Sequence, residues 1–491
     1  MSRIRSKDGL EIIKSAALVV LFLITILLLY FLWEDKPFER WAQGDNLARR
    51  EALRYDEILR PSLVAAHTGG GSYAMTPDAF EPMVDSLSAF SRSENVIMEE
   101  IEERLYKDGL RHPSVEARFH YYVPFAVMCE VFDIQRIAGA DGIDAFSAFA
   151  YTEAYPGDLF FFDQKSNRYY RLAGDGAASL PALSAIIADA GNRVTHFTLE
   201  TNFGGLIDNQ TLIPYSPESD VRDFAYVGEL ALEEEDKAAH ITRIAKSFFN
   251  DNFDFVRKIE EIGGTVIYMY GFGKIVLIID KDGTVEFKRE EAERPFTPVR
   301  YLDALDKALD FIAGHGAAEA FSENAQALHL KSVAVDLDGK RGYRFVFGFS
   351  VNGLEVFYQN SEVFEVEVIG DRVTYYKRDL ILYNENQIKA AAGDFRGICS
   401  PMNVLAYNLA HISAALYEAA PVEGASPELS IEELAAQVDR LEIAYARLAG
   451  GDETDEHVVR AVWLLTIAQL EFYFALDDGA PLGYSQRQYT L

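Results

Sequence analysis

Cysteine is almost absent from this chain, which has only Cys129 and Cys399 among its 491 residues. Two cysteines cannot make the disulfide framework on which small secreted domains depend. Cys129 lies in the mostly apolar run 127–131, and Cys399 follows a glycine and an isoleucine. We interpret both as small buried side chains, and not as nucleophiles, metal ligands or partners in a bridge.

Positive charge is scarce as well. The chain has 46 Lys and Arg residues against 77 Asp and Glu residues, which gives a formal net charge of −31. Binding to nucleic acid depends on clustered Lys and Arg that neutralise phosphates, so we expect no nucleic-acid partner. The same deficit argues against a face that lies on anionic lipid, and it favours a soluble, self-repelling surface.

Long apolar runs are missing except at residues 15–33, where only Thr25 and Tyr30 interrupt the run. A helix of this length spans roughly 28 Å, close to the hydrocarbon thickness of a bilayer. No small-x-small cleavage site follows, so we expect a retained single-pass anchor and not a cleaved signal peptide. The residues before it include four basic side chains, Arg3, Arg5, Lys7 and Lys14. This excess predicts a cytoplasmic tail at 1–14, with the bulk of the chain extracytoplasmic at the cell membrane.

Beyond the anchor, the sequence predicts an α+β protein: a transmembrane helix followed by two or three mixed α/β extracytoplasmic domains with antiparallel sheets. A charged stalk is expected at 34–60, and an N-terminal α+β domain at 61–215. A small helix-plus-sheet domain is expected at 216–295, and a C-terminal α+β domain at 296–491. Apolar residues that alternate in short runs, with helical periodicity between these runs, indicate this fold class.

The strand pattern is clearest in the third of these regions. Apolar residues alternate with mostly polar or small ones over 343–351, and the Asn352-Gly353 pair that follows is a strong hairpin signal. A second hairpin is predicted around Gly370-Asp371. Helices are expected at about 302–314 and 401–419, where they would cover one face of the sheet.

Motifs for catalysis and metal binding are also missing. Gly69–Ser72 lacks the Lys-Ser/Thr pair of a phosphate-binding loop, so it is interpreted as a turn. Asp280–Gly283 has its glycine at the fourth position, whereas a calcium-binding EF-hand loop needs it at the sixth. His315 and His329 are interpreted as surface or helix-capping groups. We therefore predict no catalytic residue, no cofactor and no metal.

A family resemblance lies in the order of several segments. They are Arg60–Val64, Phe119–Phe125, Phe248–Asn250 with Val256–Ile259, Gly264–Tyr268, Tyr343–Phe345 with Asn352–Phe357, and Arg372–Arg378. In these segments the chain resembles the YycH family, the membrane-anchored accessory proteins of the WalK sensor histidine kinase in Gram-positive bacteria. In that family the closing segment belongs to a domain shared with the sister protein YycI, which implies a YycI-like domain at 296–491.

The resemblance implies a protein that is not an enzyme and that acts by contact. Members of the family associate through their transmembrane helices with the kinase and with YycI, and thereby set kinase output and cell-wall turnover. The implied partners are a WalK-like sensor histidine kinase and a YycI-like sister protein. Since a partner shifts an equilibrium only by binding its two states unequally, activation and inhibition both remain open.

The predicted anchor offers one face for such contacts. Its members recur at three- and four-residue spacing and form one stripe of a helix: Ala17, Leu21, Ile24, Leu28 and Phe31. A kinase helix could pack there, although no small-xxx-small motif marks the face. Ordinary contact with lipid is the alternative, because every spanning helix has apolar stripes.

Two other functions stay open at this point. One is an extracytoplasmic protein that senses a wall or lipid ligand through the aromatic-rich first domain. The other is an anchored cell-wall hydrolase, which would need a cleft with a reactive Ser, Cys, Glu or zinc centre.

Overall fold

The structure is a computed structural model, and it describes most of the chain after residue 53. The described ranges are 54–175, 180–191, 193–215, 221–228, 230, 234–290, 298–315, 326–335, 337–339, 342–379, 381–383, 397–419, 428–448 and 458–486. The predicted tail, the predicted anchor at 15–33 and most of the predicted stalk lie outside this part. Within it, no helix combines the length and the apolarity that a membrane span requires.

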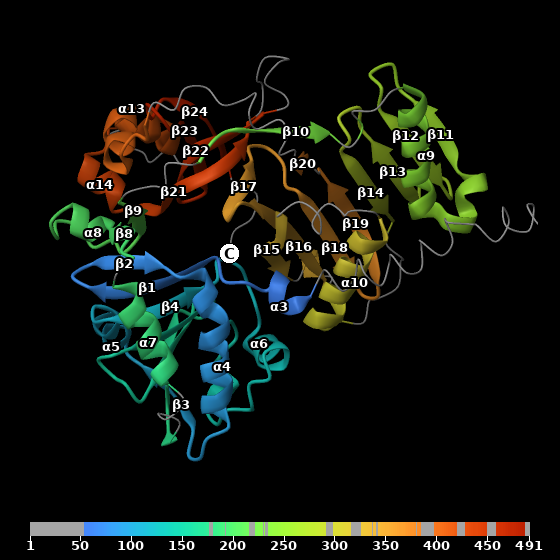
Figure 1. Cartoon of the computed structure of the whole chain (residues 1–491). Coiled ribbons are helices and arrows are strands. Elements are labelled where there is room, and N and C mark those ends of the chain that lie inside the picture. The colour runs from blue at the N-terminus through green and yellow to red at the C-terminus, as the bar shows by residue number, and fades with distance from the viewer. Residues whose placement is uncertain are drawn as a thin grey trace, which may run out of the picture. The chain divides into compact units, whose positions relative to one another are not determined.

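Nine described strands form a first sheet in which every neighbouring pair is antiparallel (Figure 1). In sheet order they are β3 (Ile97–Ile101), β7 (Arg168–Ala173), β6 (Leu159–Asp163), β5 (Ala148–Thr152), β4 (Ser114–Arg118), β1 (Leu63–Gly69), β2 (Ser72–Met75), β8 (His196–Thr198) and β9 (Leu212–Pro214). The glycines of the 69–72 run form the β1–β2 turn with positive φ, so this run is a turn as predicted.

Helices cover both faces of the first sheet. α4 (Phe80–Ser91) and α7 (Pro181–Ala190) pack together on one face, and α5 (Glu103–Leu110) packs on the other against β7 (Figure 1). α4 is helical because its apolar residues recur at helical spacing; Met83, Leu87 and Phe90 are fully buried. Short elements complete the region: η1 (Pro77–Ala79), α6 (Phe125–Val131), η2 (Ala140–Gly142) and α8 (Leu199–Asn202).

The other fifteen described strands form a second sheet. Its main path is β11 (Arg257–Glu260), β12 (Val266–Tyr270), β13 (Ile275–Ile279), β14 (Val285–Arg289), β19 (Arg372–Arg378), β18 (Phe364–Ile369), β16 (Tyr343–Val351), β17 (Leu354–Tyr358), β21 (Val438–Arg447), β22 (Val458–Ile467), β10 (Phe224–Gly228) and β20 (Ile381–Tyr383). Off this path, β15 (Gln326–Val335) pairs with β16, β23 (Leu470–Ala475) with β22, and β24 (Pro481–Gln486) with β23. The expectation of a mixed α/β chain with antiparallel sheets is confirmed.

The predicted hairpin at Asn352-Gly353 forms but is short. Both residues have positive φ, 52° and 81°, as the favoured two-residue hairpin turn requires. β16 and β17 pair at only two positions, and β17 then runs parallel to β21. The longer neighbours of β16 are β15 and β18. The second predicted hairpin, around Gly370-Asp371, is confirmed as β18 and β19.

The helices of this region pack against different parts of the second sheet. α9 (Glu234–Phe249) lies on β13, and α10 (Tyr301–Gly314) on β16, β18 and β19. α13 (Pro401–Ala419) lies with α14 (Ile431–Ala435) and against β23. The helices expected at 302–314 and 401–419 are therefore confirmed, but they contact different strands. Short 3-10 helices of this region are η4 (Asn250–Phe255) and η5 (Leu337–Gly339).

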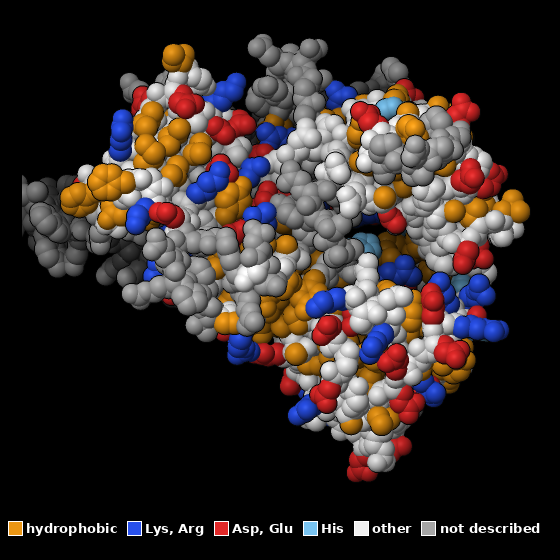
Figure 2. Space-filling model, turned by 180° about the vertical axis from the view of Figure 1, so that it is seen from behind, with side chains coloured by type: hydrophobic (Ala, Val, Ile, Leu, Met, Phe, Trp, Pro, Cys, Tyr) orange, Lys and Arg blue, Asp and Glu red, His pale blue; other side chains and the backbone are white. Residues whose placement is uncertain are grey.

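The ranges 216–295 and 296–491 contribute strands to the same sheet, because β14 pairs with β19 and β10 pairs with β22. The domain boundaries stay predictions, since strand pairing alone does not define units that fold independently. On the surface seen in Figure 2, acidic and basic side chains are interspersed.

Candidate functional site

The predicted partner-binding stripe of the anchor lies outside the described residues. It comprises Ala17, Leu21, Ile24, Leu28 and Phe31. This part of the site stays a prediction. The described part of the chain adds two places where unusual side chains meet: a junction around the first short helix, and a cluster of charges inside the second sheet.

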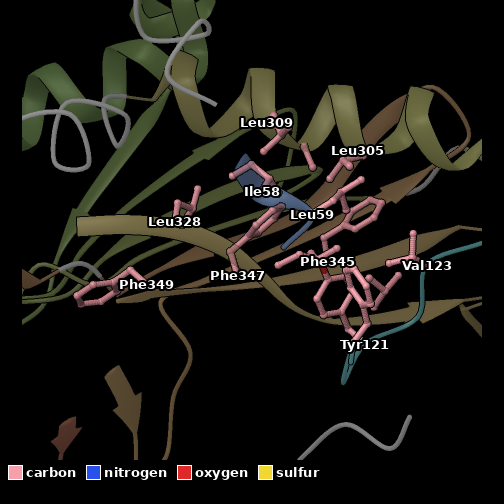
Figure 3. Close-up of a cluster of buried hydrophobic side chains, with 14 of the residues drawn as sticks. Ile58, Leu59, Tyr121, Val123, Leu305, Leu309, Leu328, Phe345, Phe347 and Phe349 are labelled. Carbon is pink, nitrogen blue, oxygen red and sulfur yellow. The ribbon is translucent and has the colours of Figure 1, made fainter. Parts of the chain in front are cut away.

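The last residues of the predicted stalk are buried in the protein. α3 (Tyr55–Ile58) is a single turn, and Ile58 and the following Leu59 are 1% and 0% exposed. Figure 3 shows their side chains beside residues from three separate segments: Leu305 and Leu309 of α10, Phe345 and Phe347 of β16, and Tyr121 and Val123 from the segment after β4. The prediction of a charged stalk missed this burial, although the apolar pair Ile58-Leu59 in a charged stretch was a visible signal.

Hydrogen bonds fix the chain where it leaves α3. The Tyr121 hydroxyl donates to the backbone carbonyl of Arg60 at 2.8 Å, and the His120 amide donates to the Ser62 hydroxyl at 3.1 Å. Burial raises the pKa of Tyr121 well above its ordinary value, so its hydroxyl stays protonated and remains a donor.

The start of α10 contacts the same region. The Tyr301 hydroxyl donates to the backbone carbonyl of Tyr122 at 3.2 Å, and Arg300 forms an ion pair with Glu130 of α6 at 3.1 Å. Tyr301 also packs edge-on against Phe345 of β16. We call this contact region the α3 junction: Ile58, Leu59, Arg60, Tyr121, Tyr122 and Tyr301. It joins α3 to segments that belong to both sheets.

Charged side chains gather inside the second sheet, where β15, β17 and β21 come together. Lys331 pairs with Glu362 at 2.8 Å, and Arg440 pairs with Glu355 at 2.8 Å. Both cations also lie over the ring of Phe357, at 4.8 and 5.1 Å from its centroid. These four charged side chains are only 15–20% exposed, so we call them the buried ion cluster.

Burial and neighbouring charges shift the titration of the cluster. Burial raises the pKa of Glu362, and Lys331 offsets this only in part. For Glu355 burial acts in the same direction, but Arg440 and then His329 hold its pKa well below the ordinary value. The pKa of Lys331 is raised by the carboxylates around it despite burial. Each carboxylate has a cation beside it, so the arrangement is suited to holding three strands together.

His315 and His329, both interpreted as surface or capping groups, lie in different surroundings. His315 follows the last residue of α10, and its Nδ1 lies 2.5 Å from the Phe311 carbonyl, so it does cap this helix. His329 is instead only 21% exposed and lies 3.8 Å from Glu355, at the edge of the buried ion cluster. The surface interpretation of His329 was therefore wrong, because β15 places it against β17.

The remaining sequence candidates carry no reactive group. Cys129 and Cys399 are unbridged and half-buried, and burial raises the pKa of Cys129 to about 11 and that of Cys399 in the same direction. Both thiols are protonated at neutral pH. Asp280–Gly283 is the tight β13–β14 turn, closed by a 3.0 Å bond from Gly283 to Asp280. Among the described residues, no group of His, Cys, Asp and Glu could hold a metal ion.

Comparisons with known proteins give matches among solved structures. No protein-family model and no curated protein sequence matches the chain. Among solved structures, YycH from Bacillus subtilis matches with a TM-score of 0.49 at 10% identity, over 84% of this chain and 95% of that one. At this identity the likeness concerns the fold alone.

Two further solved structures have weaker likenesses. An uncharacterized protein from Eubacterium rectale matches with a TM-score of 0.33 at 11% identity, over 61% of this chain and 95% of that one. The C-terminal domain of YpeB from Bacillus megaterium matches with a TM-score of 0.22 at 14% identity, over 52% of this chain and 99% of that one.

Proposed function

We propose that this chain is a non-enzymatic, membrane-anchored regulator of a WalK-type sensor histidine kinase that controls cell-wall metabolism. It acts by protein contacts, together with a YycI-like sister protein. The anchor is the helix predicted at 15–33, with the N-terminus in the cytoplasm and the folded region outside. The sequence resemblance to the YycH family and the charge pattern around the apolar run support this proposal.

The observation that carries the proposal is the burial of Ile58 and Leu59. These residues follow the predicted anchor by only 25 positions, and their side chains pack among segments of both sheets. A contact regulator has to link its membrane segment to its outer surface, and the burial of Ile58 and Leu59 fixes the outer end of that link in the core. A displacement on either side of the α3 junction is then passed to the other, because packed cores resist continuous deformation.

A pull-down from membranes tests the partners. The tagged full chain is expressed in its own bacterium, membranes are solubilised in mild detergent, and co-purified proteins are identified by mass spectrometry. We expect a sensor histidine kinase and a protein of YycI type. Kinase autophosphorylation in liposomes should change at least threefold when the full chain is added. An unchanged rate, or the absence of any histidine kinase from the pull-down, would contradict the proposal.

Two matched double variants test the predicted face of the anchor. Leu21→Ala with Leu28→Ala removes bulk from the predicted face, whereas Val19→Ala with Ile26→Ala removes similar bulk from the opposite side of the helix. We expect the first to reduce kinase recovery several-fold and the second to leave it unchanged. Equal losses from both variants would point to ordinary lipid contact for the stripe. A mature protein found released without residues 1–33 would remove the anchor from the proposal.

A further inference from the structure

The second sheet ends in an exposed edge strand. β11 is the first strand of the sheet, and no described strand pairs with its outer side (Figure 1). Arg257, Lys258 and Glu260 are exposed, and Ile259 is half-buried. Edge strands carry unpaired backbone groups and can template pairing with another chain unless side chains prevent it.

The face of the sheet beside this edge is apolar and open to solvent. Residues directly opposite each other in antiparallel strands share a face, and the register places Ile259, Ile267 and Ile278 in one row. Met269 and Val276 lie in the next row. All five are partly exposed, and α9 packs on the other face, where Tyr268 and Leu277 are buried. Figure 2 shows hydrophobic side chains gathered at this part of the surface, at the upper left.

The hydrogen-bond phase of β11 is fixed by the turn that follows it. The Glu261 amide donates to the Thr265 carbonyl at 2.9 Å, so position 261 bonds inward to β12. Bonded and non-bonded positions alternate along an antiparallel pair, so Ile259 and Arg257 also bond inward. The N–H and C=O groups of Lys258 and Glu260 therefore point outward. An added antiparallel strand has to bond to these two residues.

The charges along β11 and the residue after it are arranged so that an antiparallel second copy would place opposite charges beside each other. Two positive side chains, Arg257 and Lys258, precede two negative ones, Glu260 and Glu261, so this stretch is neutral in a chain of net charge −31. Within the strand, Lys258 and Glu260 form an exposed ion pair at 2.5 Å. A second copy of the same strand offers each charge an opposite partner.

We propose that β11 pairs in antiparallel fashion with β11 of a second copy of this chain, with Ile259 opposite Ile259 of that copy. Outward-bonding residues must oppose one another, which leaves three registers close to the centre of the strand. One places Lys258 against Lys258, and another places Glu260 against Glu260. In the third, Lys258 of each copy lies opposite Glu260 of the other copy. Only this register pairs opposite charges.

In this register Arg257 also faces Glu261 of the second copy. The row Ile259, Ile267 and Ile278 continues into the same row of the second copy, which makes one apolar strip across both sheets. Dimer formation adds backbone bonds at the outward groups of Lys258 and Glu260 and joins two half-covered apolar faces. This inference does not rest on the proposed function.

Charge reversal tests the register directly. Lys258→Glu alone and Glu260→Lys alone each oppose like charges twice in the dimer, and both sites are exposed, so the fold is kept. We expect each single variant of the full chain in detergent to dimerise at least tenfold more weakly than the unaltered chain in sedimentation velocity. An equimolar mixture of the two variants, and the double variant, should recover dimerisation.

A cysteine cross-link gives a second readout. Ile259→Cys places two thiols at a non-hydrogen-bonded pair, where Cα atoms lie about 4.5 Å apart, within disulfide range. We expect an oxidised dimer of twice the 55.0 kDa chain mass for Ile259→Cys. The matched Ile262→Cys variant and the unaltered chain, which keeps Cys129 and Cys399, should remain uncrosslinked. A monomer at all concentrations, a dimer indifferent to the charge reversals, or equal cross-linking of both variants overturns the proposal.

Discussion

The hydroxyl of Tyr121 donates a 2.8 Å hydrogen bond to the backbone carbonyl of Arg60, and so it ties the end of the α3 segment to the region that follows β4. Both groups lie beside the buried Leu59. This bond holds the chain at the point where it passes from the predicted stalk into the first strand, β1.

Removal of this hydroxyl should weaken the α3 junction. We expect Tyr121→Phe to lower the free energy of unfolding by about 1 kcal/mol, because the Arg60 carbonyl loses its partner. Urea unfolding followed by circular dichroism measures the change. Tyr215→Phe, at a side chain that is 70% exposed, is the matched control and should have no effect. Equal effects in both variants would mean that the bond does not matter.

Truncation of Leu59 tests how firmly the segment is packed. We expect Leu59→Ala to cost about 2–5 kcal/mol, the range for a buried leucine whose site cannot collapse fully. Leu206 is 78% exposed, so Leu206→Ala should change the unfolding free energy by less than about 0.5 kcal/mol. A small loss at Leu59 would show that α3 is loosely docked, and it would contradict the firm packing of Leu59 on which the proposed function depends.

In the buried ion cluster, the effect of removing Lys331 on stability should depend strongly on whether Glu362 keeps its charge. Lys331→Met leaves the Glu362 carboxylate without its cation, and we expect a loss of about 3–5 kcal/mol. The double variant Lys331→Met/Glu362→Gln removes both charges and should recover most of this loss. As a control, Lys107→Met breaks an exposed pair with Glu103 on α5 and should cause no measurable change. Additive losses in the double variant would mean that the two side chains act independently.

Two half-buried histidines predict a loss of stability that begins near pH 6.5, above the pH at which ordinary carboxylates titrate. Burial lowers the pKa of His315 to about 4, helped by Arg378 and Arg289, and burial lowers that of His196 to about 4 as well. An unfolded histidine takes up its proton near pH 6.5. Between pH 6.5 and 4 the unfolded chain therefore binds more protons, and stability that is present above this window is lost as pH falls through it.

Unfolding free energies at pH 7, 6, 5 and 4.5 check this. We expect a slope of up to about 1.4 kcal/mol per pH unit for each histidine. His315→Asn keeps a donor for the Phe311 carbonyl but does not titrate, so it should reduce the slope by about one proton. A pH profile unchanged by this variant would show that the folded protein does not hold His315 neutral in solution.

Elements with a local signal could be predicted from the sequence. α10 follows from apolar residues at helical spacing, and the Asn352-Gly353 turn follows from the demand for positive φ at both positions. No local sequence signal shows which strands will pair with each other in a sheet. β17 leaves its hairpin after two pairs and joins β21, nearly ninety residues further on, because the packing of distant segments decides this pairing.

The candidate sites were harder to predict for the same reason. Lys331, Glu355 and Arg440 lie on three different strands, and Arg440 follows Glu355 by 85 residues. In the sequence, each of them resembles an ordinary surface charge. The burial of Ile58 and Leu59 also depends on α10, which begins more than 240 residues later. The anchor at 15–33 stays a prediction, and it rests on a local signal because bilayer thickness sets the length that a single run of residues must reach.

The pairing of β10 with β22 has a consequence for synthesis of the chain. Phe224 lies opposite Val459, so one neighbour of this strand is missing until almost the whole polypeptide has emerged. The first sheet, in contrast, has all its strands once residue 214 is out. During synthesis the first sheet can therefore form completely while the second sheet still lacks β22. A premature stop before residue 458 would leave β10 without its β22 neighbour.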